Sequence, residues 1–599
     1  MYRSLRYLVL FAFAVAVAAV PAPAAFDPAV ESQNYSKTNE RQTIVDTPEY
    51  QQKLDEVSRA NLLEMVHIQA TDPERNFTGH ACATDGRGCA GDARLYDWGP
   101  KGYGLVTPVL FTARNGATLS GHVWATRAGP ARRPGIVITS GSVQASEQMY
   151  WQFAETLAKD GYVVLSFDPQ GEGRSDENGE APDRDEGSPN QTDGRPFFDG
   201  TEDAINFFLS TPAHPYVPET SCSTGTSHAP KQDRRVNAGL DAAYNPYWAM
   251  LDPGRLGIAG HSYGAAGVSY IGQWDPRVKA IVAWDNLSVP RAGTNNMSFP
   301  PGEAGCPAHP GDRTDAKLAK PALGITADYF IPPEPNVREP DPYGCTNQRQ
   351  GTNGDNFGCK VSESLEYSKA GVDTGAIVIR GGSHYEFSFL PDAAFGATLR
   401  GADLAAWYTS AWFDKYVKGD CTADRRLITN RWRRDGQEAA IDPNGDGNMF
   451  SFYYPSRLDV HLADGTRYRN EHLRTDAHDL ISDDGFGGDY SYVSIDRSPD
   501  DATTSFGSCD RAPSASSPAV RCAAVSKLRF PLRHARRTRI VKVQVFVDGK
   551  RRLSRRGHDL RSVTVGHLPR RAFRLKIVST QSNGGKRTLR RSYRACPRR

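Results

Sequence analysis

Patterns typical of buried strands and of helices alternate through the middle of the chain. Continuous apolar runs, each of strand length, occur at residues 135–139, 162–167, 257–259, 279–283, 322–326 and 376–379. A helical pattern at 148–159 separates the first two runs. Strands that are apolar on both faces and separated by helices predict a mostly parallel sheet covered on both sides. We therefore expect an α/β domain over residues 105–420, opened by a hairpin at Asn115-Gly116.

The pattern changes after residue 420. Residues 421–510 are predicted to form a further β-rich lobe, and the Ala-, Pro- and Ser-rich stretch at 511–520 has the composition of a linker. Beyond it, short alternating runs are separated by turn signals such as Asp548-Gly549. We expect residues 521–599 to form a small β-sandwich, which resembles the Ig-like domains appended to exported bacterial enzymes.

Charge is distributed unequally between these parts. From residue 520 onward there are 25 lysines and arginines against two aspartates, a net charge of +23, although the whole chain carries only +3. Such a basic domain is either a structural appendage or an attachment to an anionic surface, for example cell-wall polymer or lipid headgroups. Binding to nucleic acid is the less favoured interpretation, because an exported location is expected and aromatic residues are few.

The N-terminus has the pattern of a secretory signal peptide. Arg3 and Arg6 precede an apolar run at 7–20, and small residues follow up to Ala25. The run is shorter than the roughly 20 residues of a spanning helix. We expect residues 1–25 to be removed, residues 26–104 to form an N-terminal extension, and the mature protein to be secreted without a transmembrane segment.

Export changes the interpretation of the ten cysteines, because an even number in an oxidising compartment favours disulfides over metal ligands. We expect Cys82 to pair with Cys89 across a short glycine-rich loop, and Cys522 with Cys596. The remaining six cysteines cannot be paired from spacing; Cys345 with Cys359 and Cys421 with Cys509 are the preferred pairs.

The stretch LGIAGHSYGAAGVSYIG at 256–272 carries the first candidate for catalysis. An apolar strand pattern stops at Gly260 and a small-residue helix pattern starts at Gly264, so Ser262 lies at the turn between them. This is the G-x-S-x-G pattern of a nucleophile elbow. His261, inside the same turn, is expected to have a structural role with its side chain directed away from the active face.

Two further polar residues follow strands downstream. Asp328 comes just after the run at 322–326, and His384 after the run at 376–379. The carboxyl ends of parallel strands are where open α/β sheets bind ligands. The order Ser, Asp, His differs from that of chymotrypsin-like and subtilisin-like enzymes.

With these motifs, residues 105–420 resemble the α/β-hydrolase superfamily. The segment Asp168-Pro-Gln-Gly-Glu-Gly-Arg-Ser175 is similar to that family's D-x-x-G-x-G-x-S turn. The resemblance is strongest to the exported esterase, lipase and polyester-hydrolase branch and to the dienelactone hydrolases. It implies that Ser262 is the nucleophile, His384 the base and Asp328 the acid, with Asp285 as an alternative acid after the strand at 279–283.

The same resemblance implies an oxyanion hole built from backbone amides. Tyr263, directly after the nucleophile, is one expected donor. The second is expected after the strand at 135–139, where Ser140-Gly141 replaces the family's His-Gly; Ser142 is preferred and Val143 comes next. Val143, together with Gln144, Tyr150 and Trp151, is also expected to line the substrate pocket.

One segment suggests a metal. Asp442, Asn444 and Asp446 have the spacing of the first half of a calcium loop, with glycine at the sixth position. The twelfth position is Tyr453 rather than glutamate, so a plain polar turn is the alternative. No other cofactor is indicated, since there is no P-loop and the Gly171/Gly173 turn lacks a dinucleotide-binding context.

The sequence thus predicts a secreted serine hydrolase that cleaves small-molecule or polymeric carboxylic esters through an acyl-enzyme. A peptidase of the same fold is an alternative, although the residues before the core are too few for the β-propeller of prolyl-type peptidases. A non-catalytic surface-adhesion protein is the alternative from another class. An intact Ser262, Asp328 and His384 set disfavours it, because adhesion requires none of the three.

Overall fold

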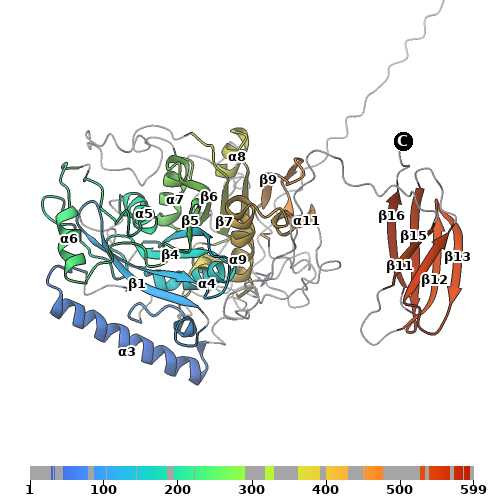
Figure 1. Cartoon of the computed structure of the whole chain (residues 1–599), viewed down its shortest axis with the longest axis horizontal. Coiled ribbons are helices and arrows are strands. Elements are labelled where there is room, and N and C mark those ends of the chain that lie inside the picture. The colour runs from blue at the N-terminus through green and yellow to red at the C-terminus, as the bar shows by residue number, and fades with distance from the viewer. Residues whose placement is uncertain are drawn as a thin grey trace, which may run out of the picture. The chain divides into compact units, whose positions relative to one another are not determined.

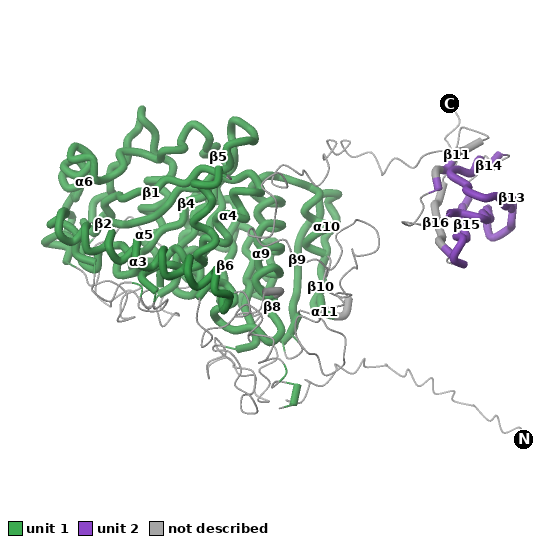
Figure 2. Tube along the Cα trace, turned by 90° about the horizontal axis from the view of Figure 1, so that it is seen from below, with its two compact units in different colours: residues 1–509 green, residues 510–599 purple. Residues whose placement is uncertain are grey.

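The protein is represented by a computed structural model. It describes residues 29–30, 33, 45–77, 82, 87–102, 104–142, 145–184, 195–221, 223–290, 317–329, 362–390, 399–428, 450–451, 454–476, 527–532, 539–566, 573–584 and 586–593. The chain divides into two compact units, Met1–Cys509 and Asp510–Arg599, coloured separately in Figure 2.

A ten-stranded mixed sheet organises the first unit (Figure 1). Its strands in spatial order are β1 (Leu105–Thr112), β2 (Thr118–Ala125), β4 (Val163–Asp168), β3 (Arg133–Thr139), β5 (Leu251–His261), β6 (Val278–Trp284), β7 (Ala322–Ala327), β8 (Thr374–Ile379), β9 (Arg457–His461) and β10 (Arg467–Asn470). The six central strands, β4, β3, β5, β6, β7 and β8, pair in parallel with one another. The two outer strands on each side, β1 and β2 or β9 and β10, pair antiparallel with their neighbours. The predicted α/β class is therefore confirmed.

Helices cover both faces of this sheet. Alternate residues of β3 separate the two cores: Ile136 and Ile138 face one, and Val137 faces the other. The first core is closed by α4 (Trp151–Lys159) and α9 (Leu399–Phe413), the second by α5 (Arg195–Phe208), α7 (Tyr263–Trp274) and α8 (Ser362–Lys369). Because every residue of β3, β4, β7 and β8 is buried, these strands have continuous apolar runs rather than alternation.

The other helical elements of the first unit are shorter or lie at its margin. They are α3 (Pro48–Thr71), η1 (Ala93–Asp97), η2 (Glu147–Tyr150), α6 (Ala229–Asn237), η6 (His384–Phe387), η8 (Asp414–Lys418), α10 (Ala423–Leu427) and α11 (Leu473–Asp476). Among the described residues, no helix combines the length and the apolar character needed to cross a membrane.

The segment 421–510 was expected to form a separate β-rich lobe, and its described strands correct this. β9 pairs with β8, and β10 pairs with β9, so both extend the main sheet. The side chains of Leu458 and Val460 are buried in the core that α4 and α9 close. This burial explains why the strands join the sheet instead of forming a lobe with its own core.

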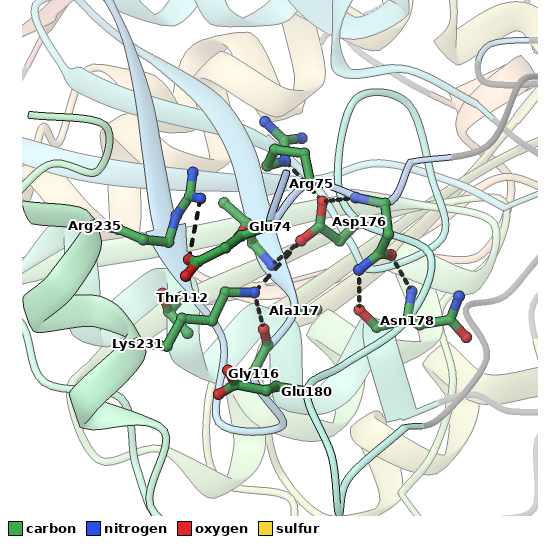
Figure 3. Close-up of polar contacts among 12 residues, drawn as sticks. Glu74, Arg75, Thr112, Gly116, Ala117, Asp176, Asn178, Glu180, Lys231 and Arg235 are labelled. Carbon is green, nitrogen blue, oxygen red and sulfur yellow. Dashed lines mark hydrogen bonds and ion pairs between the residues drawn. The ribbon is translucent and has the colours of Figure 1, made fainter. Parts of the chain in front are cut away.

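Within the first unit, the N-terminal extension contacts the rest of the unit through helix α3 and the residues after it. Thr47 caps the helix, its hydroxyl accepting a hydrogen bond from the amide of Tyr50 at 3.3 Å. After the helix, the guanidinium of Arg75 lies 2.7 Å from the carboxylate of Asp176, and both side chains are buried (Figure 3). The amides of Asn76 and Thr118 donate to the same carboxylate, at 3.0 and 2.9 Å. Asp176 therefore joins the extension to the hairpin and to the turn after β4.

Only some of the predicted disulfides fall on described residues. Cys82 and Cys89 are bonded, as predicted. Cys421 is also disulfide-bonded, but its expected partner Cys509 lies outside the described residues. The same holds for the remaining cysteines, for the signal peptide at 1–25, for Val143 and Gln144, and for the calcium loop with Asp442, Asn444 and Asp446.

The second unit consists of two antiparallel sheets. One contains β11 (Lys527–Pro531) and β14 (Ser562–Gly566); the other has the order β13 (Lys550–Arg556), β12 (Ile540–Val547), β15 (Phe573–Gln581) and β16 (Lys586–Tyr593). Phe530 and Val563 of the first sheet share one apolar core with Val543, Val545 and Ile577 of the second. A small β-sandwich was predicted for residues 521–599, and the described strands form antiparallel sheets around one core.

Candidate active site

Ser262 occupies the turn between β5 and α7. Its backbone has φ 57° and ψ −118°, a region that a serine enters only at an energetic cost. The turn is held on both sides: the Ser262 amide donates to the carbonyl of Trp284 at 2.9 Å, and the Ser262 carbonyl accepts from the amide of Ala266 at 3.2 Å. The serine is thus fixed at the apex of a strained strand-to-helix turn.

The flanking glycines are required by close backbone contacts. A Cβ at Gly260 would lie 2.4 Å from the carbonyl oxygen of Gly264, and a Cβ at Gly264 would lie 2.4 Å from that of Ser140. A Cβ at Gly141 would lie 3.3 Å from the Cβ of Ser262. The loop after β3 therefore passes directly beside the serine.

His384 follows strand β8 and is the first residue of the short helix η6. It lies three residues after Gly381, whose positive φ of 65° turns the chain. Ser383 caps the short helix η6, its hydroxyl accepting from the amide of Tyr385 at 3.2 Å. The Nδ1 of His384 lies 2.7 Å from Oδ2 of Asp285, and both side chains are almost fully buried. Asp285 follows β6 directly, and its other oxygen accepts a hydrogen bond from the hydroxyl of Thr326.

Asp328 does not hold His384, and the expectation that it would is wrong. Its carboxylate accepts hydrogen bonds from the guanidinium of Arg380 at 3.1 Å, from the amide of Gly381 at 2.9 Å and from the hydroxyl of Ser451. The Asp328 amide continues the ladder to β8 by donating to Ile379 at 3.1 Å. Its side chain therefore contacts Arg380 and Gly381, the two residues directly after β8, whereas His384 lies farther along the chain and contacts Asp285, the alternative acid.

Of the two predicted oxyanion donors, one lies at the start of α7 and the other in the loop after β3. Tyr263 is the first residue of α7, where backbone N–H groups have no partner within the helix. Ser142 is half-buried and follows Gly141 in the loop beside Ser262. The amide of Gly141 itself donates to the hydroxyl of Tyr150 at 3.1 Å. Because the Gly141 amide already has this partner, a backbone amide after Gly141 is the better candidate for the second oxyanion donor.

Tyr150 and Trp151 were expected to line a substrate pocket, and the structure corrects both. Trp151 is packed in the core, its ring 4.9 Å from that of Trp124, and its Nε1 donates to Glu147 at 3.0 Å. Tyr150 is 1% exposed, and its hydroxyl lies 2.7 Å from Nδ1 of His261. Both residues belong to the helical segment that packs on the sheet, so their side chains are buried in the core.

The contacts of His261 are more specific than the structural role that the sequence indicated. Its ring stacks obliquely on that of His384, with centroids 4.5 Å apart, and its Nε2 lies 2.8 Å from the backbone carbonyl of His384. Burial, together with the nearby His384, lowers the pKa of His261 well below its ordinary value, although Asp285 opposes this shift. His261 is therefore neutral at physiological pH.

The D-x-x-G-x-G-x-S turn supports the loop after β3. The carboxylate of Asp168 accepts from the amides of Glu147 at 2.7 Å and Arg174 at 2.9 Å, and Glu172 accepts from the amide of Ala145 at 2.8 Å. Burial and the charge of Glu147 raise the pKa of Asp168 well above its ordinary range. This turn fixes Ala145 and Glu147, which lead into helix α4.

Neither a metal site among the described residues nor a similar known protein adds to the evidence for this site. Within the part of the chain that the structure describes, no three His, Cys, Asp or Glu side chains come together as a metal site. No protein-family model matches the chain, and no curated protein matches it either.

Proposed function

We propose that this protein is a secreted serine hydrolase of the α/β-hydrolase fold that cleaves carboxylic esters through an acyl-enzyme. The observation that carries the proposal is the buried Asp285–His384 pair in contact with the residue that precedes a strained serine. The strand order and the chain order Ser262, Asp285, His384 support the choice of fold.

Each residue has a defined part in this chemistry. His384 accepts the hydroxyl proton as Ser262 attacks the ester carbonyl, and it returns that proton to the departing alcohol. Asp285 holds the imidazole tautomer through Nδ1 and stabilises the imidazolium. The amides of Tyr263 and Ser142 are the proposed donors to the oxyanion. Water, deprotonated by His384, then attacks the acyl-enzyme, which releases the acid and restores Ser262.

The test compares the wild type with Ser262→Ala on p-nitrophenyl acetate, butyrate, octanoate and palmitate. We expect turnover that falls by about 10⁵-fold or more in the variant, because the nucleophile acts as a unit with its base. The chain length with the highest kcat/KM separates an esterase from a lipase. Absence of wild-type turnover on every ester overturns the proposal; a peptidase of the same fold, and then an adhesion protein, would become the better hypothesis.

For the second unit we propose attachment to an anionic cell-wall polymer, because positively charged side chains gather on one face of its larger sheet. Lys542 lies directly opposite Arg556, and Phe546 directly opposite Lys576, whose ammonium lies 5.9 Å from the ring centroid. Like charges placed opposite each other destabilise a sheet. The pairing of Lys542 with Arg556 therefore favours a ligand that supplies the missing negative charge.

Retention of the full chain on an immobilised phosphodiester polymer tests this attachment. The triple variant Lys542→Gln, Arg556→Gln and Lys576→Gln should elute at clearly lower salt than the wild type, because exposed charges are screened at moderate ionic strength. The matched comparison is Lys542→Gln alone against Arg561→Gln, since each removes one positive charge and the arginine is already paired with Asp559. Equal elution of these two single variants would contradict the proposal, and selective retention on anionic vesicles would indicate lipid headgroups instead.

A further inference from the structure

A continuous chain of hydrogen bonds connects three loops of the candidate site. It runs from the amide of Gly141 to the hydroxyl of Tyr150 at 3.1 Å, from that hydroxyl to Nδ1 of His261 at 2.7 Å, and from Nε2 of His261 to the carbonyl of His384 at 2.8 Å. The rings of Tyr150 and His261 are both buried, so water does not compete for these contacts.

The chemistry of the partners fixes the direction of every bond. A carbonyl oxygen only accepts, so Nε2 of His261 carries the proton toward His384. Because His261 is neutral, its Nδ1 is then a bare acceptor and takes the hydroxyl hydrogen of Tyr150. Burial raises the pKa of Tyr150, which keeps that hydrogen in place, and the phenol oxygen accepts from Gly141.

The two ends of this chain are the parts that the proposed reaction must align. One end is the backbone of His384, the residue that takes the proton of Ser262. The other is the amide next to Ser142, the proposed oxyanion donor, in a loop that passes against the Cβ of Ser262. A displacement of about 1 Å between such groups costs on the order of 100-fold in rate.

We propose that Tyr150 and His261 are positioning residues of the hydrolase, holding the loop of the base and the oxyanion loop at one separation around Ser262. This inference rests on the proposed function. Neither side chain donates or accepts a proton in the proposed reaction. Tyr150 acts through His261, and His261 acts through the ring and the backbone carbonyl of His384. Removal of either side chain should therefore lower kcat through geometry and leave KM nearly unchanged.

Tyr150→Phe is the smallest test, since it removes one oxygen atom and keeps the buried ring. We expect kcat on p-nitrophenyl butyrate to fall roughly 10- to 100-fold with KM changed by less than about twofold. Tyr162→Phe is the matched control: Tyr162 is also fully buried and donates its hydroxyl to Asp414 at 2.9 Å, but it precedes β4, at the amino end of the parallel strands, whereas the candidate site lies at their carboxyl ends. It should lose stability to a similar degree and retain kcat.

Substitutions of His261 separate the two halves of the chain. Glutamine reaches as far as Nε2 and can still donate to the carbonyl of His384, whereas asparagine reaches only as far as Nδ1 and keeps the bond with Tyr150. If the position of His384 matters most, His261→Gln should retain more of kcat than His261→Asn. Independently of turnover, the ¹⁵N shifts of the histidines should show a neutral ring protonated on Nε2, and Tyr150→Phe should perturb that ring.

The outcomes are distinguishable from a failure of the proposed function. A wild type without turnover on any ester overturns the proposed function and this inference with it. A wild type with turnover, joined to a Tyr150→Phe variant that keeps kcat or a Tyr162→Phe variant that loses as much, overturns the positioning role alone.

Discussion

Asp285 and His384 are joined across 99 positions of sequence by a 2.7 Å contact between Oδ2 and Nδ1. Asp328, the residue that the sequence favoured for this contact, lies instead against Arg380. Both carboxylates are buried, and both follow a parallel strand. They differ in the charge that each one faces, and substitution of each should therefore have a different result.

Asp285→Asn should lower kcat/KM by about 10³- to 10⁴-fold with little change in stability, because the amide no longer fixes the productive tautomer of His384. Asp328→Asn should instead lower the free energy of unfolding by about 3 kcal/mol, because the positive charge of the buried Arg380 would be less compensated. Steady-state kinetics and urea unfolding on both variants measure the two effects. A larger kinetic loss in Asp328→Asn than in Asp285→Asn would return Asp328 to the role of acid.

Gly264→Ala should prevent the elbow from forming. The new Cβ would lie 2.4 Å from the carbonyl oxygen of Ser140, a backbone atom that cannot move without displacing β3. We expect a loss of at least about 1–3 kcal/mol in stability, the usual cost of overpacking, together with loss of ester turnover. Gly254→Ala is the control, because its Cβ would meet the nearest atom, in Asp252, at an ordinary 3.4 Å. Equal thermal midpoints for the two variants would contradict this account.

The sequence predicted the sheet better than the site because burial leaves a local pattern and side-chain pairing does not. The runs that became β3, β4, β7 and β8 are apolar on both faces, which only a covered sheet explains. The strand pattern before Asp285 was as clear as the one before Asp328. The choice between these two acids depended on where residues 381–383 carry His384, which no local signal specifies.

Tyr150 illustrates the same limit. It was expected to line a substrate pocket near the elbow, yet it is buried against His261, a partner 111 positions away in sequence. The edge strands β9 and β10 were also assigned to another lobe, since pairing with β8 depends on contacts that are distant in sequence. Contacts between residues so far apart in sequence can be identified only when the fold is known.

Stability should depend on pH through His261. Burial lowers its folded pKa well below the unfolded value of 6.5, so the unfolded chain binds the additional proton as the pH falls. The wild type should therefore lose about 1.4 kcal/mol from this residue between pH 7.5 and pH 5.5, and His261→Gln should lack that loss. Urea unfolding of both proteins at the two pH values isolates the contribution of His261, because the other titrating groups are common to both. Parallel pH curves would show that His261 is protonated in the folded state, contrary to its burial.

The ion pair that attaches the N-terminal extension gives the final prediction. Arg75→Met should lower the free energy of unfolding by about 3 kcal/mol, because Asp176 would stay buried with its negative charge less compensated. The amides of Asn76 and Thr118 still donate to Asp176, so the loss should be at the lower end for a buried pair. Adding Asp176→Asn should restore part of this stability, and a double-mutant cycle measures the coupling. Strictly additive effects would mean that the amides and the buried ammonium of Lys231, which lies 3.7 Å from the Asp176 carboxylate, hold Asp176 rather than Arg75, and that the extension is attached mainly by the packing of α3.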